Sequence, residues 1–309
     1  MTGRPKAAPD AAGGRAGACG GAPPAVTVVI ATRNRAAGLC RTLDRLAALP
    51  EQPPVIVVDN ASTDGTPAAV AARHPGVDVV RLPRNRGAAA RNAGAALAGT
   101  RFVAFSDDDS WWQDGALARA ARLLDNWPGL GLVAASTRVG TEQAEDPING
   151  LLAASPLPSA GLPGPRVLGF LACAAVVRRS AFLAVGGFSE LLLLSGEEAL
   201  LAMDLAAAGW PAAYAAGVVA LHHPSPHRDA PGRRRLEARN RVLISLLRRP
   251  PAAVLADCAR LAAQLPGDRA AAGALAALLP LLPRALRERR PLPPGIEAMV
   301  ALIELARTG

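Results

Sequence analysis

A chain of 309 residues can bury one large core with an appendage, or two modest domains. Half of the residues are apolar, which excludes an intrinsically disordered protein, and aromatic residues make up only 3%, so Ala, Val and Leu must build the core. The formal net charge of +9 permits attraction to anions, but no basic run is interleaved with aromatic residues and no zinc-finger spacing occurs, so no specific nucleic-acid partner is expected.

The first part of the chain predicts alternating strands and helices. Residues 1–24 consist mainly of Gly, Ala and Pro and are typical of a disordered tail, so the first domain is expected to begin at residue 25. Continuous β-branched runs then predict strands that are buried on both faces. The expected order is strand 26–30, helix 36–48, strand 55–58, helix 68–73, strand 77–82, helix 88–97 and strand 102–105.

This alternation predicts an α/β protein with a mostly parallel sheet and helices on both of its faces. In such sheets the ligand site lies beyond the carboxyl ends of the strands. Three polar segments follow strand ends directly, namely 32–35, 59–60 and Asp107-Asp108-Asp109. We therefore expect these three segments to converge on one site.

The second part of the chain is expected to continue this domain to residue 230. Its pattern predicts a helix over 113–127, a strand over 131–136, a long surface loop over 137–166, a strand over 170–177, a short helix over 179–185, a helix from 195 to about 208 and a strand over 217–221. Residues 231–309 are predicted to form Ala- and Leu-rich helices broken by prolines, and no function can be attached to them. The Arg-rich stretch 233–241 is predicted mainly as a solvated helical face, with contact to a membrane surface as the alternative.

Cysteine spacing and apolar patterning indicate where the protein resides. The four cysteines show no CxxC pairing, which argues against a structural zinc site or a disulfide framework and suits a reducing cytoplasm. The N-terminal segment lacks the apolar core of a signal peptide, and no uninterrupted apolar stretch reaches the ~18 residues that a transmembrane helix needs. We expect a soluble cytoplasmic protein, with peripheral contact at the inner membrane face as the alternative.

The run of three aspartates after strand 102–105 points to a bound cation. Carboxylates packed this closely repel one another, and each pKa rises unless a positive charge compensates. A hard divalent cation is suited to this role because Mg²⁺ and Mn²⁺ prefer oxygen ligands. The alternative is a solvated acidic turn, and the surrounding motifs decide between the two.

Four motifs occur in the order that a known family shows. They are Val28-Val29-Ile30-Ala31-Thr32-Arg33-Asn34-Arg35, Val57-Val58-Asp59-Asn60-Ala61-Ser62-Thr63-Asp64-Gly65-Thr66, Asn85-Arg86-Gly87 with Arg91-Asn92-Ala93-Gly94, and Phe105-Ser106-Asp107-Asp108-Asp109. The series resembles the family 2 inverting glycosyltransferases over roughly residues 25–225. The resemblance implies the GT-A fold of the nucleotide-diphospho-sugar transferases for a domain over 25–230, followed by a C-terminal helical extension over 231–309.

The resemblance places a nucleotide-sugar donor at the first strand ends. It implies nucleotide contacts from Thr32 and Arg33, and a hydrogen bond from a uracil or thymine imide to Asp59. Arg91 would bond to phosphate or base oxygens, form an ion pair with one of the three aspartates, or do both. The alternatives are that Asp59 is an Asx-turn or helix-cap residue and that Arg33 is solvated at the surface.

The same resemblance implies a metal site with a DXD motif. Asp109 would coordinate Mn²⁺ or Mg²⁺, and Asp107 would lie near both the ribose and the metal. Asp108 ranks third of the three aspartates, because its side chain points differently in an extended segment. His222 and His223 follow a strand, where an imidazole can ligate Mn²⁺ or contact phosphate. An exposed turn histidine is the alternative for at least one of the two.

Glu198 is the general base that the resemblance implies. Family members usually carry Glu-Asp at the start of this helix, with the second residue as the base, and this chain has Glu197-Glu198. The additional methylene keeps the carboxylate but displaces it. The alternative is that both residues stabilise the N-terminus of the helix through its dipole.

The sequence thus predicts a metal-dependent inverting glycosyltransferase. It would move a sugar from a UDP- or dTDP-sugar to a hydroxyl of a saccharide, a lipid-linked acceptor or a small molecule. One alternative is a sugar-phosphate nucleotidyltransferase, although residues 32–35 do not supply the Gly-rich basic loop of that class. The other is an inactive nucleotide-sugar-binding or scaffold protein, in which Glu-Glu in place of Glu-Asp marks lost activity.

Overall fold

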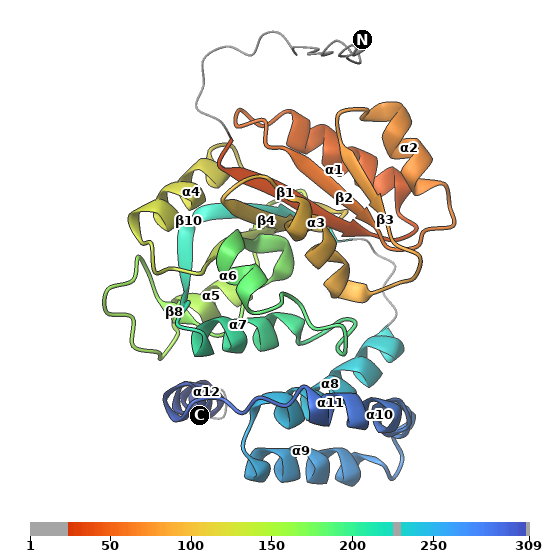
Figure 1. The fold of residues 1–309 in the computed structure, drawn as a ribbon, viewed down its shortest axis with the longest axis vertical. Coiled ribbons are helices and arrows are strands. Elements are labelled where there is room, and N and C mark those ends of the chain that lie inside the picture. Colours follow the sequence, from red (N-terminus) through yellow and green to blue (C-terminus); the bar gives the residue numbers. More distant parts are fainter. Residues whose placement is uncertain (1–23, 225–229, 307–309) are drawn as a thin grey trace, which may run out of the picture.

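The computed structural model describes residues 24–224 and 230–306, and the tail predicted over 1–24 lies outside them except for Pro24. One mixed sheet runs through the protein (Figure 1). In sheet order its main strands are β3 (Asp78–Arg81), β2 (Val55–Asp59), β1 (Val26–Thr32), β4 (Phe102–Ser106), β9 (Ala175–Arg178), β6 (Leu132–Val139), β10 (Ala212–His222) and β5 (Ser110–Trp112). The predicted α/β class is confirmed.

The half of the sheet formed by β3, β2, β1 and β4 is parallel, as the alternating pattern predicts. The helices of this half are α1 (Ala36–Ala47), α2 (Thr66–Arg73) and α3 (Arg91–Leu97), and a 3-10 turn over Gly87–Ala90 precedes α3. In α1 the side chains of Leu39, Leu43 and Leu46 recur at helical spacing and are buried. Parallel pairing directs all four strands so that their carboxyl ends meet at one edge.

The other half of the sheet is mixed in direction, which the sequence pattern does not predict. Strand β9 lies antiparallel between β4 and β6, β10 runs parallel to β6, and β5 pairs antiparallel with the end of β10. The strand predicted over 170–177 begins only at Ala175, because Ala172–Ala174 form a 3-10 turn. Two helices of this half, α4 (Ala116–Asn126) and α6 (Arg179–Ala184), agree with the predicted ones apart from their ends.

The segment 137–166, predicted as one long surface loop, contains regular structure. It holds the end of β6, β7 (Ala144–Glu145), α5 (Ile148–Ala153) and the start of β8 (Arg166–Val167). Asn149 ties α5 to β6, because its side chain accepts the N–H of Thr137 and donates to the carbonyl of Thr137, both at 2.9 Å. The prediction of an irregular loop was therefore wrong for much of this segment.

Alternate side chains of the strands fill two cores on opposite faces of the sheet. Val28 and Ile30 of β1 join the core under α1 and α4, whereas Val29 joins the core under α3 and α6. In the second core Phe105 packs against Phe182 and Phe188, with ring centroids 5.2 and 5.4 Å away. These two cores anchor β1 and β4, whose carboxyl ends carry polar residues.

Gly94 of α3 faces β1 and β2 at close range. A Cβ at this position would lie 2.5 Å from Cγ1 of Val29 and 3.1 Å from Cγ2 of Val58. Gly94→Ala is therefore expected to overpack the core and to lower the free energy of unfolding by about 1–3 kcal/mol in urea titrations. Gly99→Ala is the matched control, because no atom lies within 4 Å of its added Cβ. Equal stability of the two variants would contradict the close packing of α3.

The C-terminal part of the chain forms a layer of helices beside the sheet domain (Figure 1). It consists of α8 (Ala230–Arg248), α9 (Pro251–Gln264), α10 (Arg269–Leu278), α11 (Leu282–Arg287) and α12 (Pro294–Ala306), and it lies against α7 (Glu197–Ala207). Leu191 and Leu200, which flank the start of α7, share a buried cluster with Val242, Leu243 and Leu247 of α8. The predicted C-terminal helices are thus present and packed on the sheet domain.

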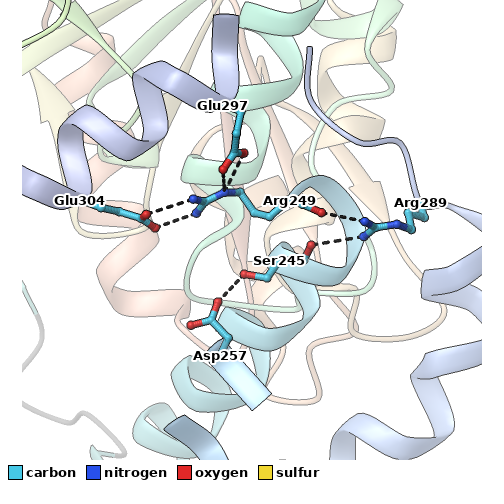
Figure 2. Close-up of polar contacts among 6 residues, drawn as sticks. All are labelled: Ser245, Arg249, Asp257, Arg289, Glu297 and Glu304. Carbon is cyan, nitrogen blue, oxygen red and sulfur yellow. Dashed lines mark hydrogen bonds and ion pairs between the residues drawn. The ribbon is translucent and has the colours of Figure 1, made fainter. Parts of the chain in front are cut away.

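Arg249, the residue just after α8, connects α12 to the other helices of this layer through hydrogen bonds and ion pairs (Figure 2). Its guanidinium donates from Nε to Glu297 at 2.9 Å and from Nη1 and Nη2 to Glu304 at 2.7 and 3.0 Å. Its carbonyl accepts from Arg289 at 2.7 Å. Because Arg249 is buried, its bonds to Glu297 are partly shielded from water, whereas the side chain of Glu304 is 57% exposed and its ion pair is screened more strongly.

Among the described residues, one segment, Arg269–Arg287, is long and apolar enough to cross a membrane by length and composition, and 22% of it is buried. It comprises α10, a 3-10 turn and α11, and it includes Pro280 and Pro283. One of its faces packs in the cluster of α8, whereas Leu279 and Leu286 are exposed. The sequence predicts no transmembrane helix, and this segment is one weak candidate for such a helix.

Candidate active site

Parallel register places the polar strand ends side by side. Thr32 at the end of β1 is paired with Asp59 at the end of β2, and the N–H of Asn60 donates to the carbonyl of Thr32 at 2.8 Å. On the other side of β1, Ile30 is paired with Ser106, the residue before the three aspartates. The structure therefore brings together the three segments that the sequence predicts to converge.

Asp59 is fully buried and leaves one carboxylate oxygen without a hydrogen bond. Its Oδ1 accepts the N–H of Ser62 at 3.2 Å, so the Asx-turn that the sequence offered as an alternative is present. Its Oδ2 lies 3.6 Å from Nε of the exposed Arg81 and accepts no hydrogen bond from the described residues. Since buried polar atoms are rarely left without a donor, Oδ2 is available to an N–H group of a ligand.

Asp108 is held toward β1 and α1. The Thr32 hydroxyl donates to Asp108 Oδ2 at 2.8 Å, and the Thr42 hydroxyl donates to the Asp108 carbonyl at 2.9 Å. Burial raises the pKa of the Asp108 carboxyl to about 6, against the bond from Thr32, and repulsion from Asp107 and Asp109 adds to the rise. Asp108 thus binds Thr32 directly, and Thr32 is itself buried.

Asp107 forms an ion pair with Arg91, the first residue of α3. Nη2 of the buried Arg91 donates to Oδ1 of Asp107, which is one of the two roles that the sequence left open for this arginine. Burial opposes the charge on Arg91, but the nearby Asp107, Glu197 and Glu198 outweigh this effect and raise its pKa. Arg91 Nε has no hydrogen-bond partner among the described residues. Arg91 therefore binds one of the aspartates and acts electrostatically on the two carboxyls at the start of α7.

Asp109 and His222 meet because β5 pairs with the end of β10. His222 is in register with Ser110, and its Nε2 lies 3.4 Å from Oδ1 of Asp109. The N–H of His223 donates to the Asp109 carbonyl at 2.8 Å, while the ring of His223 stacks on Trp111 with centroids 4.6 Å apart. His222 therefore faces the carboxylate, and His223 packs on an aromatic ring.

Three side chains of this region could hold a cation. One ligand atom each from Asp107, Cys173 and His222 lie within 4.8 Å of one another. Cys173 lies in the 3-10 turn before β9 and is buried, and burial raises the pKa of its thiol well above the ordinary value. Cys173 was not predicted from the sequence, because its ligand partners come from distant strands and no local spacing reveals them. Of the four predicted metal ligands, Asp109 and His223 are not in this group.

Glu197 and Glu198 begin α7 on the far side of Arg91. Burial raises the pKa of both carboxyls, whereas Arg91 favours their charged forms. Glu197 is 5% exposed, and its Oε2 has no hydrogen-bond partner among the described residues. A carboxylate with a raised pKa beside a fixed cation is suited to accept a proton near neutral pH.

Arg33 differs from the other predicted site residues in its surroundings. It is exposed just after the buried Thr32, as the surface alternative expected. The remaining predicted residues lie at the ends of β1, β2, β4 and β10 and at the starts of α3 and α7. Arg33 is thus the member of the set with the least support from its surroundings.

Comparison with known sequences identifies related proteins. The model of the family "Glycosyl transferase family 2" matches residues 27–184, which is more than half of the chain. N-acetylglucosaminyl-diphospho-decaprenol L-rhamnosyltransferase of Mycobacterium tuberculosis is 29% identical over 230 residues, covering 63% of this chain and 75% of that protein. Pre-mycofactocin glycosyltransferase of the same organism is 35% identical over 215 residues, covering 66% of this chain and 44% of that protein.

Solved structures share the fold at low sequence identity. The mannosyltransferase PcManGT from Pyrobaculum calidifontis, in complex with GDP-Man and Mn²⁺, matches with a TM-score of 0.58 and 24% identity over 92% of this chain and 86% of that one. Residues 1–349 of TarS from S. aureus, in complex with UDP, match with a TM-score of 0.55 and 18% identity over 92% of this chain and 91% of that one. These likenesses establish the GT-A fold.

Proposed function

The chain belongs to glycosyl transferase family 2 and is a glycosyltransferase, and on this premise we propose that it is a metal-dependent, inverting enzyme that uses a UDP- or dTDP-sugar. One observation carries the proposal. Arg91 forms an ion pair with Asp107, and its positive charge also acts on the Glu198 carboxylate. A donor-binding carboxylate and the proposed base therefore lie on either side of the Arg91 guanidinium. The sugar to be transferred would lie between Asp107 and Glu198.

The strand ends supply the groups that a nucleotide needs. Asp59 Oδ2, buried without a hydrogen bond, would accept the imide N–H of uracil or thymine. Thr32, Asp107 and Asp108 would contact the donor, and Arg33 would reach it from the surface. In the mannosyltransferase structure and the TarS structure the bound nucleotides are GDP-Man and UDP, which supports a nucleoside-diphosphate donor for this chain.

The residues present fit a hard divalent cation. Asp107 and His222 belong to the group described above, and Asp109 places its Oδ1 3.4 Å from His222 Nε2. Two carboxylates and an imidazole would suit Mn²⁺ and would also accept Mg²⁺. When bound, the cation would stabilise the negative charge on the departing nucleoside diphosphate. His223 packs on Trp111, so we assign its imidazole a supporting contact.

The acceptor step would require a single base. Glu198 would remove the proton of the acceptor hydroxyl while the oxygen attacks the anomeric carbon from the face opposite the diphosphate. Arg91 would keep Glu198 charged and Asp107 in place. Because the proposal uses no protein nucleophile, the sugar changes its anomeric configuration once.

Incubation with a panel of UDP- and dTDP-sugars and Mn²⁺ tests this function. We expect slow hydrolysis that releases the nucleoside diphosphate and the free sugar. Formation of a nucleotide-sugar and pyrophosphate from a nucleoside triphosphate and a sugar phosphate would instead favour a nucleotidyltransferase. Donor binding in calorimetry without any turnover would favour an inactive binding or scaffold protein.

Asp59→Asn tests the base-reading role of Asp59. The N–H of Ser62 needs an acceptor, so the amide oxygen would stay there and the NH₂ group would replace Oδ2. Two donors would then face each other, and UDP is expected to bind roughly tenfold more weakly or worse, since a hydrogen bond to a charged group contributes about 1.5–3 kcal/mol. Calorimetry measures this loss. UDP methylated at N3 is the control, because the substitution should hardly change its affinity. An unchanged affinity for UDP itself would refute the role.

Exposed leucines of the C-terminal helices support contact with a membrane surface. Leu255, Leu279, Leu286, Leu302 and Leu305 are all more than 40% exposed, on a protein with a net charge of +9. The rhamnosyltransferase relative is named for a diphospho-decaprenol acceptor, so a lipid-linked acceptor at the inner membrane face is the partner that we favour over a free saccharide or small molecule. Sedimentation with anionic phospholipid vesicles tests this contact.

A further inference from the structure

The backbone just before the proposed base adopts a conformation that side chains disfavour. Leu193, Ser195 and Gly196 have φ angles of +60°, +71° and +89°. Leu and Ser rarely occupy the left-handed region, so the surrounding structure must hold them there. These residues belong to the loop 191–196, which leads directly into α7 and its first-turn residue Glu198. The shape of this loop therefore determines where Glu198 lies.

Asn240 of α8 places its side-chain NH₂ group within hydrogen-bond distance of three carbonyls of this loop, which share its two N–H donors. Its Nδ2 lies 2.8 Å from the carbonyl oxygen of Leu192 and 2.6 Å from those of Leu194 and Ser195. The side chain is 1% exposed, so water does not compete for these bonds. The Asn240 amide group therefore lies close to carbonyls on both sides of Leu193, whose backbone is in the left-handed conformation.

Arg239 orients the Asn240 amide. Its Nε donates to Oδ1 of Asn240 at 2.9 Å, which turns the NH₂ group toward the loop, and its Nη2 donates to the Leu192 carbonyl at 2.8 Å. Arg239 is only 8% exposed. The stretch 233–241, predicted mainly as a solvated face, therefore contains two buried residues, Arg239 and Asn240.

The opposite side of the loop is held by the turn that precedes Arg91. The N–H of Ala88 donates to the Leu193 carbonyl at 2.7 Å, and a Cβ on Gly87 would lie 1.9 Å from that oxygen. On the α8 side, a Cβ on Gly196 would lie 2.8 Å from Cδ1 of Ile244. The loop 191–196 is therefore packed between the turn before Arg91 on one side and α8 on the other. Gly87 permits the close approach of that turn to the loop, and Gly196 permits the close approach of the loop to α8.

We infer that Asn240, supported by Arg239, is a positioning residue for Glu198. The inference rests on the proposed function, in which Glu198 is the base. It assigns a role to the C-terminal layer, because α8 supplies the hydrogen bonds that hold the loop 191–196 in the conformation from which α7 starts. Asn240 touches neither donor nor acceptor and acts through the loop alone.

Two substitutions separate the hydrogen bonds from the volume of the side chain. Asn240→Ala removes both, whereas Asn240→Asp keeps the shape and presents oxygen to three carbonyl oxygens. In hydrolysis of the best UDP- or dTDP-sugar with Mn²⁺, both variants should lower kcat by roughly 10²-fold, the effect of a misplaced catalytic group, with KM for the donor changed less than about twofold. Amide hydrogen exchange of residues 191–198 should rise in both.

Ser245→Ala is the matched control on the same helix. Ser245 is also buried in α8, but its hydroxyl bonds to Asp257 of α9 and not to the loop (Figure 2). This variant should keep kcat and the exchange rate of 191–198. Calorimetric binding of the nucleoside diphosphate by each variant shows that the sheet domain remains folded.

The outcomes distinguish this inference from the proposed function. An inactive Glu198→Gln together with low kcat in both Asn240 variants supports the positioning role. Wild-type kcat in Asn240→Asp, or faster loop exchange without loss of kcat, overturns the role while the base assignment stands. An equal fall in kcat for Ser245→Ala also overturns it, because any damage to α8 would then suffice. Full turnover by Glu198→Gln refutes the proposed function itself.

Discussion

Replacement of Glu198 by Gln is expected to lower kcat for donor hydrolysis by about 10²–10⁴-fold, the usual contribution of a general base. Gln keeps the shape of the side chain but cannot accept a proton from the attacking oxygen. Donor affinity should remain close to that of the wild type, because the proposed role of Glu198 is to act on the acceptor. Release of nucleoside diphosphate from a UDP- or dTDP-sugar measures kcat, and calorimetry measures binding.

The pH dependence of the wild type follows from the direction of the Glu198 shift. Burial raises the pKa of this carboxyl above its ordinary value of 4.5, and the base works only when deprotonated. The rate should therefore rise with pH through this raised pKa and level off above it. In Glu198→Gln this acid limb should disappear from the residual activity, because the titrating group is gone.

Glu197→Gln is the matched control for this prediction. Glu197 is the neighbouring carboxylate, is buried, and also experiences a raised pKa from burial. We expect its substitution to reduce kcat much less than that of Glu198. The opposite order, with Glu197→Gln inactive and Glu198→Gln active, would transfer the base to Glu197 and contradict the assignment.

Asp109→Asn is expected to have the second large effect, by weakening the cation site. The change removes the charge of one carboxylate 3.4 Å from His222, and the proposed cation would contribute several kcal/mol to the stabilisation of the leaving group. We expect Mn²⁺ affinity to fall, as measured by electron paramagnetic resonance of free Mn²⁺. Hydrolysis at low Mn²⁺ should fall by about 10²-fold or more.

Asp114→Asn provides the control for charge alone. Asp114 lies five residues further along the chain and is exposed, so its loss changes the net charge equally. Mn²⁺ binding and turnover should remain as in the wild type. Unchanged Mn²⁺ affinity in Asp109→Asn would show that Asp109 is not a ligand, for example because Asp107, Cys173 and His222 hold the cation without it.

The parallel half of the fold could be predicted because its signals are local. Strands such as β1 and β2 are continuous β-branched runs, and α1 carries leucines at helical spacing. The antiparallel insertion of β9 and the short β5 could not be predicted, since pairing partners far apart in the sequence decide them. The helix α5 was missed because it is short and depends on the side-chain bonds of Asn149 to β6.

The polar residues at strand ends were predictable for a topological reason. Parallel strands bring their carboxyl ends together whatever the detailed packing, so Thr32, Asp59 and the aspartates had to meet. Cys173, Arg239 and Asn240 could not be found in this way. Cys173 lies in an apolar turn, and Asn240 lies within the arginine-rich stretch 233–241, whose pattern indicates solvent exposure. Only the three-dimensional packing of α8 on the loop 191–196 reveals the hydrogen bonds of Asn240 to the loop carbonyls.

The anomeric configuration of the released sugar tests the central claim most directly. Proton NMR can follow hydrolysis of an α-linked UDP- or dTDP-sugar by the Mn²⁺-loaded enzyme before the free sugar equilibrates. A single displacement assisted by Glu198 predicts that the β anomer forms first, and that Glu198→Gln forms it far more slowly. Initial release of the α anomer would contradict the account, because retention requires a different mechanism.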